Sequence, residues 1–153
     1  MAAPCTWVVV ANGSRARFLA SDERLEEIES IVELEHPASR AKAHELTSDD
    51  RGRTRPRNKD SHRGAAIAYT TPPHEVELDR FSRQVADRIR TGHAINALDA
   101  LVLVASPEFL GKLQARLSAP LRRIVRASIP KDYTNDSPEI ALGRIRAELA
   151  RPD

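Results

Sequence analysis

Hydrophobic residues near the start of the chain follow patterns typical of β-strands. The run at 7–10 is rich in β-branched residues, and an Asn-Gly pair follows it, which tolerates the positive φ angles of tight hairpin turns. After that pair, Ala16 and Phe18 fall on one face of a strand, while Arg15 and Arg17 fall on the other. The pattern predicts a hairpin of two antiparallel strands with both arginines on its polar face.

The segment 24–36 is ambiguous, because its apolar positions fit a helix and also fit the alternation of a strand. A third strand directly after a hairpin is the more economical choice, and Pro37 would end it. Residues 38–46 are expected to form a short helix.

The clearest helix of the chain is expected at 72–92. Apolar residues recur there with helical spacing and form one stripe: Leu78, Phe81, Val85 and Ile89. Acidic residues in the first turns suit the positive end of the helix dipole, and Gly92 is expected to stop the helix.

The last third of the chain alternates between apolar runs and helical patterns. The run 100–105 is apolar throughout, as expected of a strand that helices cover on both faces. Ser106 and Ser137 each precede a Pro-Glu pair, which predicts two capped helix starts, with a strand at 123–130 between them. The final helix is expected to turn three residues toward the core: Ile140, Ile145 and Leu149.

The predicted order is three strands, a loop, and then helix, strand, helix, strand, helix. An antiparallel meander followed by strand–helix alternation argues for an α/β fold with a mixed sheet and helices packed on it. A chain of 153 residues suits a single domain over 1–153. Because aromatic residues make up only 4% of the chain, aliphatic side chains must fill its core.

Positive charge is concentrated locally, although the net charge of the whole chain is only +2. Residues 51–63, called the basic segment below, contain six lysines and arginines against one acid, and no aliphatic or aromatic side chain. A second group lies at Arg122, Arg123 and Arg126. For a polyanionic partner such clustering matters more than the total charge.

The single cysteine, Cys5, excludes an intrachain disulfide framework and suits a reducing compartment. The first residues lack a positive leader, and their apolar run is short for a signal peptide. No stretch approaches the roughly 20 apolar residues of a membrane span. We therefore expect a soluble cytoplasmic protein that does not contact a membrane.

Four motifs, taken together, resemble the bacterial host attachment protein family. They are WVVVANGSRARFLA, SDDRGR, LVLVASPEFLGKLQARL and IPKDYTNDSPEIALGRI, and in this order they cover residues 6–150. That family is in turn similar, more distantly, to the middle domain of eukaryotic and archaeal peptide-chain release factors and of Pelota. The resemblance implies a ribonuclease-H-like fold in which a flexible basic loop, here at about 48–74, precedes the long helix.

In release factors that loop carries Gly-Gly-Gln, which enters the peptidyl-transferase centre of the ribosome. The corresponding stretch here, DDRGRTRPRNKDSHRG, has no Gly-Gly pair and no glutamine. The resemblance therefore implies the position of the loop without peptide-release activity.

Two interpretations of the basic segment stay open. Arginine binds phosphate through a planar fork of donors, so the segment could contact RNA or the ribosome; it could also be a solvated insertion without a role. Without an aromatic residue, recognition would be of the RNA backbone or shape. The candidate RNA-binding residues are Arg51, Arg53, Arg55, Arg57, Lys59 and Arg63, supported by Arg15 and Arg17 on the hairpin.

Two other function classes compete with RNA binding. In one, the domain docks a protein partner and affects attachment to host cells, and the basic segment is idle. In the other, it is a metal-dependent nuclease, which needs converging carboxylates. The first predicted strand carries no acid, and Asp99 before the central strand and Asp49 with Asp50 make a poor metal-binding set. We therefore expect no catalysis, no metal and no cofactor.

The stretch 131–134 (KDYT) follows a predicted strand and precedes a capped helix. It could be a contact patch beside the basic segment, but a turn in which Asp132 and Thr134 bond local backbone groups is the favoured interpretation.

Overall fold

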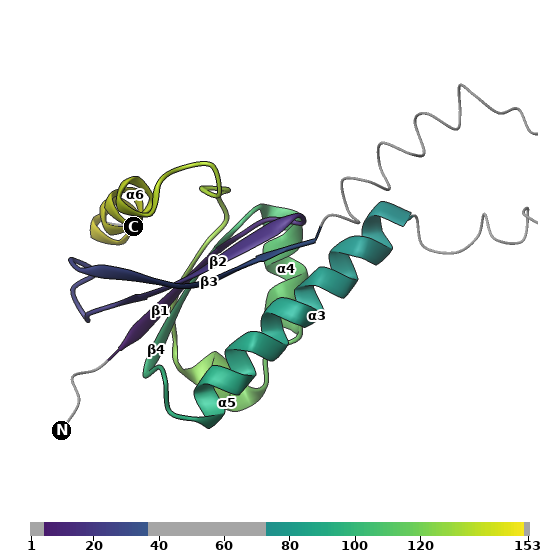
Figure 1. Ribbon diagram of the computed structural model, residues 1–153, viewed down its shortest axis with the longest axis horizontal. Helices are drawn as coiled ribbons and strands as arrows, with labels where there is room; N and C mark the ends of the chain where they lie inside the picture. Colours follow the sequence, from purple (N-terminus) through teal and green to yellow (C-terminus); the bar gives the residue numbers. More distant parts are fainter. Residues whose placement is uncertain (1–4, 37–72, 152–153) are drawn as a thin grey trace, which may run out of the picture.

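The computed structural model describes residues 5–36 and 73–151, which form five strands and four helices (Figure 1). In chain order these are β1 (Thr6–Ala11), β2 (Arg15–Ser21), β3 (Ile28–Glu35), α3 (Pro73–Ala94), β4 (Ala100–Ala105), α4 (Pro107–Ala115), α5 (Ala119–Arg123), β5 (Val125–Ile129) and α6 (Pro138–Ala150). The predicted order is confirmed, with the short helix α5 as an addition. The helix expected at 38–46 and residues 48–72 of the expected loop lie outside the described residues.

The strands form one mixed sheet in the order β3-β2-β1-β4-β5. β1, β2 and β3 pair antiparallel as the predicted meander, whereas β4 lies parallel to β1 and β5 lies parallel to β4. The ambiguous segment is thus a strand, as expected. β1, β3, β4 and β5 therefore finish at one end of the sheet, where α3, α4 and α6 begin.

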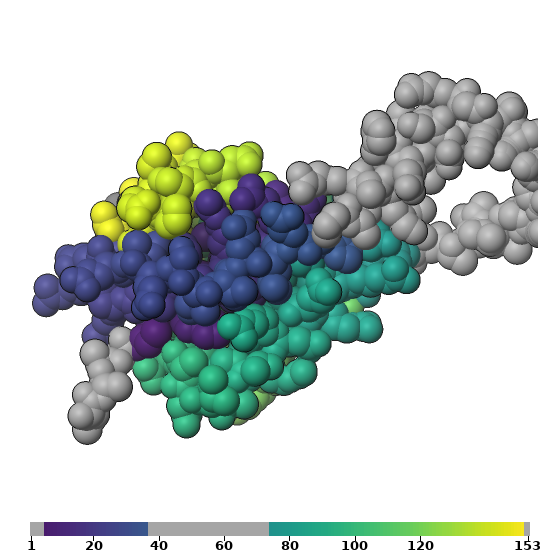
Figure 2. Space-filling view, in the orientation of Figure 1, coloured from purple at the N-terminus to yellow at the C-terminus, as the bar shows by residue number. Residues whose placement is uncertain are grey.

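Helices cover both faces of the sheet, with α3, α4 and α5 on one side and α6 on the other (Figure 1). In the space-filling view the meander lies between α3 and α6 (Figure 2). Alternate residues of β1 serve the two cores: Trp7 and Val9 face α3, and Val8 and Val10 face α6. β4 is buried on both faces, as predicted, and each fully buried aliphatic or aromatic side chain contributes about 1.5–3 kcal/mol.

The apolar stripe of α3 is buried as predicted, with Leu78, Phe81, Val85 and Ile89 at most 3% exposed. Gly92, however, does not stop this helix, which continues to Ala94. A Cβ atom on Gly92 would lie 2.3 Å from Cη2 of Trp7, so the glycine lets the indole pack directly on the helix backbone. Asn96, at φ 60°, adopts the left-handed conformation that ends the helical path. None of the described helices is long and apolar enough to cross a membrane.

The turn between β1 and β2 also differs from the prediction, because Gly13 does not have a positive φ angle. Instead the side-chain oxygen of Asn12 accepts hydrogen bonds from the backbone N–H groups of Ser14 (2.8 Å) and Arg15 (3.0 Å). A Cβ atom on Gly13 would lie 2.3 Å from Cδ2 of Leu78. The glycine thus leaves room for the side chain of Leu78 where α3 approaches the turn.

The predicted helix caps have different outcomes. Ser137 caps α6, since its Oγ accepts a hydrogen bond from the N–H of Ile140 at 3.2 Å. Ser106 occupies the equivalent position of α4, but its side chain makes no capping hydrogen bond. In α6 only Ile145 of the three expected core residues is buried; Ile140 is 55% and Leu149 37% exposed, because the helix instead turns Ala141 and Leu142 toward the sheet.

Candidate functional site

The first described range ends at His36, beside the turn between β1 and β2, and the second begins at Pro73, the first residue of α3. The N–H of His36 donates to the carbonyl oxygen of Ser14 at 2.7 Å. Nε2 of His36 lies 2.7 Å from Oε1 of Glu77 in the first turns of α3, and its ring stacks on Phe81 at 5.2 Å. Residues 37–72, which contain the basic segment, are therefore attached to the fold at one end of the sheet.

Glu77 is a buried carboxylate, 2% exposed, that sequence reasoning had assigned only to the helix dipole. Its two oxygens meet different partners: Oε1 meets His36, and Oε2 lies 3.4 Å from Nη1 of Arg80. A buried carboxylate without such partners would be strongly unfavourable. The available signal was its spacing, because Glu77 lies four positions before Phe81 and thus on the apolar stripe of α3.

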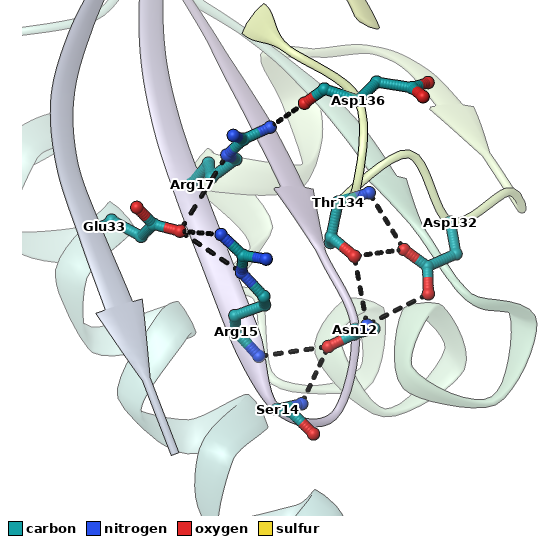
Figure 3. A network of polar contacts seen from close by, with 8 residues as sticks. All are labelled: Asn12, Ser14, Arg15, Arg17, Glu33, Asp132, Thr134 and Asp136. Atoms are coloured by element: carbon teal, nitrogen blue, oxygen red, sulfur yellow. Dashed lines mark hydrogen bonds and ion pairs between the residues drawn. The ribbon is translucent and has the colours of Figure 1, made fainter. Parts of the chain in front are cut away.

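Arg15 and Arg17 lie on the polar face of β2, as predicted, but both converge on one carboxylate of the neighbouring strand (Figure 3). Arg15 places Nε and Nη2 at 3.2 Å and 2.5 Å from Oε2 of Glu33, and this hydrogen-bonded pairing raises the pKa of Arg15. Nε of Arg17 lies 3.9 Å from the same oxygen, and its Nη1 donates to the backbone carbonyl of Asp136. Both candidate side chains are therefore engaged within the fold.

A second set of polar contacts joins the β1–β2 turn to the segment after β5 (Figure 3). Nδ2 of Asn12 donates to Oδ2 of Asp132 at 3.0 Å and to Oγ1 of Thr134 at 3.1 Å. Asp132 in turn accepts from the N–H and the hydroxyl of Thr134 at 2.9 Å and 2.6 Å, which confirms the predicted local turn. The link to Asn12, distant in sequence, was not predicted.

The pKa of Asp132 reflects these contacts. Partial burial opposes ionisation, but the hydrogen bonds from Thr134 and Asn12 outweigh it and lower the pKa of the carboxyl group. The donors thus hold Asp132 in its charged form. We call the trio of Asn12, Asp132 and Thr134 the polar clip.

Of the residues considered for metal or thiol chemistry, Asp99 and Cys5 lie at the opposite end of β1, whereas Asp49 and Asp50 lie outside the described residues. Oδ2 of Asp99 accepts a hydrogen bond from the backbone N–H of Cys5 at 2.8 Å. Burial and, secondarily, the charge of Asp99 raise the pKa of the Cys5 thiol, so the reactive thiolate is disfavoured. Within residues 5–36 and 73–151, no three His, Cys, Asp or Glu side chains gather to hold a metal ion.

The six candidate residues of the basic segment lie outside the described residues: Arg51, Arg53, Arg55, Arg57, Lys59 and Arg63. The sequence nevertheless divides the charge clearly between the two parts of the chain. The described ranges hold sixteen lysines and arginines against seventeen aspartates and glutamates, whereas 37–72 holds eight against four. The excess of positive charge is thus confined to the part attached at His36 and Pro73.

A family model described as "Protein required for attachment to host cells" matches residues 7–145. No curated protein matches the chain. The family match runs from the second residue of β1 into α6 and so extends across both halves of the sheet. The chain therefore belongs to the host attachment protein family.

Proposed function

We propose that this protein is a non-catalytic, single-domain module that binds RNA, as free RNA or within the ribosome, through the basic segment. The observation that carries the proposal is the division of charge. The described fold is almost balanced, and the positive excess lies in 37–72, the stretch of chain that joins His36 to α3. His36 itself contacts Glu77 in the first turns of that helix. Clustered arginines on one tether can neutralise successive phosphates of one strand.

The resemblance to the release-factor middle domain supports the same proposal. In that domain the equivalent loop precedes the long helix and reaches the ribosome, and the fold is ribonuclease-H-like. The present order of meander, insertion, long helix and central strand is compatible with that arrangement. We extend the proposal to a cytoplasmic location and to an indirect role in attachment, with RNA as the direct partner.

Arg15 and Arg17 have a secondary role in this proposal. They lie at the root of the basic segment, where two guanidinium groups face the single carboxylate of Glu33. A phosphate that the basic segment has already brought close would compete with Glu33 for one of these two guanidinium groups.

The test measures binding of the full chain to a labelled single-stranded RNA over a range of salt concentrations. If six phosphates are neutralised, log K falls with log salt with a slope of about −4. Changing the six lysines and arginines of the basic segment to glutamine should remove most of this slope. The matched control has the order of residues 51–63 permuted and so keeps their total charge. If the segment recognises the RNA phosphate backbone, this control should bind RNA like the wild type.

Cosedimentation with ribosomes at low and high salt extends the test to lysate. Unchanged RNA binding and cosedimentation by the glutamine variant would refute the assignment to the basic segment. Metal-stimulated RNA cleavage that disappears in Asp99→Asn would instead replace the binding proposal with a nuclease.

A protein-docking role for the family is the alternative. In the described ranges the exposed large hydrophobic residues are Ile95, Ile140 and Leu149. Ile95 follows α3, and the other two lie near opposite ends of α6, so these three residues do not form one apolar patch. Among the described residues, these three therefore give a protein partner no continuous exposed apolar patch, and RNA binding through the basic segment remains the preferred proposal.

A further inference from the structure

The edge strand β5 offers a surface that the RNA proposal does not use. β5 is the last strand of the sheet, and among the described residues no strand pairs with its outer side. Backbone groups on such an edge can pair with an added strand from another chain. This edge is short, Val125 to Ile129, so it can accept only a brief extended segment.

A hollow of about 220 Å³ lies beside this edge, on the side of the sheet that α4 and α5 cover. Its lining comes from β4, β5 and the chain around α4 and α5: Leu103, Gln114, Leu117, Arg122, Val125 and Ser128. Leu103 and Leu117 are buried, while Val125 is only partly covered. The hollow therefore has an aliphatic floor next to an open backbone edge, and we call the two together the β5 groove.

The charged rim of the β5 groove is positive. Arg122 lines it and Arg123 follows in the same helix; both are exposed, and neither forms an ion pair with any residue of the described ranges. Arg126 is held elsewhere, since its Nη1 donates to the carbonyl oxygen of Glu23 at 2.8 Å. None of the six lining residues is acidic.

We propose that the β5 groove binds an extended acidic segment of a partner protein as an added strand. The main chain of that segment pairs with β5, alternate aliphatic side chains enter the hollow, and flanking carboxylates meet Arg122 and Arg123. The geometry follows from the two-residue period of a strand, which directs every second side chain to the same face. Exposed arginines that pair with no carboxylate of the described ranges favour an acidic segment by charge complementarity.

Other occupants fit less well. The phosphates of an RNA strand could pair with the arginines, but the aliphatic floor of the hollow provides no donor or positive charge for them. Pairing β5 with β5 of a second copy would bring the same arginines together, and like charges across an interface are unfavourable. β3 of a second copy is acidic, but pairing β3 with β5 repeats without closing and leads to filaments.

The probe is a labelled, terminally blocked peptide, Glu-Thr-Leu-Thr-Val-Thr-Glu, which places two glutamates and two aliphatic residues on one face. We expect saturable binding to the full chain, with slower amide exchange at 125–129. The double charge reversal Arg122→Glu with Arg123→Glu should weaken binding by about tenfold or more, because two attractive contacts become repulsive. Both positions are exposed, so this variant keeps the fold. The matched control reverses Arg24 and Arg83, two arginines that are also exposed and lie outside the β5 groove, and it should bind normally.

Two altered peptides separate the contributions. A peptide with lysines in place of both glutamates tests the charge, and a peptide with N-methylated threonines tests strand pairing; both should fail to bind. Equal binding of all peptides, equal binding by the charge-reversed variant, or a dissociation constant weaker than about 1 mM would overturn the proposal.

Two further outcomes identify another occupant and equally overturn it. Concentration-dependent filaments without added peptide indicate a second copy. A loss of RNA binding in the charge-reversed variant, with peptide binding absent in the wild type, indicates RNA. The glutamine variant of the basic segment should bind the peptide normally, so this proposal and the RNA proposal can fail separately.

Discussion

The two edges of the sheet carry charges of opposite sign, and they differ in how far neighbouring side chains neutralise these charges. β3 carries three glutamates, Glu29, Glu33 and Glu35, and Arg15 and Arg17 of the adjacent strand converge on Glu33. At the other edge, Arg122 and Arg123 precede β5 without a carboxylate partner among the described residues. The acidic edge is therefore partly neutralised from within, and the basic edge is left open.

This difference shows that a strand pattern predicts which face a side chain lies on, but not whether that side chain is free to bind a ligand. Alternation correctly placed Arg15 and Arg17 on the polar face of β2, but opposite-charge pairing across neighbouring strands decides how they are used. Arg122 and Arg123, which were outside the predicted RNA-binding set, have the freer guanidinium groups.

The largest expected effect on stability concerns the turn between β2 and β3, which contacts α6 and β5 and so links the two edges of the sheet. Leu25, in the turn between β2 and β3, is 1% exposed, and its carbonyl oxygen accepts a hydrogen bond from Arg146 at 2.6 Å. The nearby carbonyl of Glu23 accepts from Arg126 of β5. Leu25→Ala should lower the free energy of unfolding by about 2–4 kcal/mol, measured by urea denaturation, because it leaves a cavity between the turn and α6.

Leu149→Ala is the matched control, since Leu149 lies on α6 but is 37% exposed. It should cost less than about 1 kcal/mol. If both variants lost the same free energy, the turn would not anchor the acidic edge to the rest of the molecule.

Breaking the polar clip should have the next largest effect, because it holds the meander to the segment after β5. Asn12→Ala removes the acceptor of the Ser14 and Arg15 N–H groups and the donor to Asp132 and Thr134. We expect a loss of about 1–3 kcal/mol in the free energy of unfolding, as for partners left unsatisfied in a partly buried place.

Asn12→Asp separates the two functions of this side chain. It keeps the acceptor for the turn but places a carboxylate against Asp132, so its deficit at pH 7 should shrink near pH 4, where a protonated carboxyl can donate. Identical deficits for the alanine and aspartate variants at both pH values would mean that the clip adds nothing to the turn.

The sequence predicted most of the fold because its main elements have strong periodicity. The apolar stripe of α3, the uniform run of β4 and the alternation in β2 each predicted the burial that the structure shows. The misses depend on distant contacts: Gly92 has its role because Trp7 packs on it, and Gly13 because Leu78 approaches it. Neither partner can be identified from local spacing.

The candidate site could be predicted only in part, for the same reason. The alternation of residues predicts which face of β2 carries Arg15 and Arg17. The pairing of Arg15 with Glu33, however, depends on the register between β2 and β3. The link from Asn12 to Asp132 requires the parallel placement of β1, β4 and β5. For α6, Ile140 was expected inside and lies outside, because weak periodicity does not fix the rotation of a helix.

A smaller effect is expected from removing the charge that Arg15 and Arg17 share. Glu33→Gln should cost only about 0.2–1 kcal/mol of stability, because the ion pairs are partly exposed. It should also raise RNA affinity at low salt by roughly twofold, since a released guanidinium group becomes available to phosphate. Fluorescence titration with the labelled RNA measures the change.

Glu29→Gln is the matched control, because Glu29 lies on the same strand but opposite Ala20, away from both arginines. It removes the same charge from β3 without releasing either side chain. An equal gain in affinity for both variants would indicate a general effect of net charge and would remove Arg15 and Arg17 from the RNA-binding surface.

The smallest expected effect is the acid sensitivity that Asp132 gives to the segment after β5. Its folded pKa is lowered, so the folded state prefers the ionised carboxyl group, and this stabilisation is present above the unfolded pKa of about 4. This stabilisation is lost as the pH falls through the lowered pKa of Asp132 in the folded state. Asp132→Asn should therefore be less stable than the wild type at pH 7. The difference in the free energy of unfolding, within about 1 kcal/mol for a partly exposed group, should narrow toward pH 3. Urea denaturation at both pH values measures it, with Asp136→Asn as the control on the same segment. A difference that stayed constant or widened on acidification would show that the Thr134 and Asn12 donors do not favour the ionised form. The charge of Asp132 would then contribute nothing to the polar clip that joins the β1–β2 turn to the segment after β5.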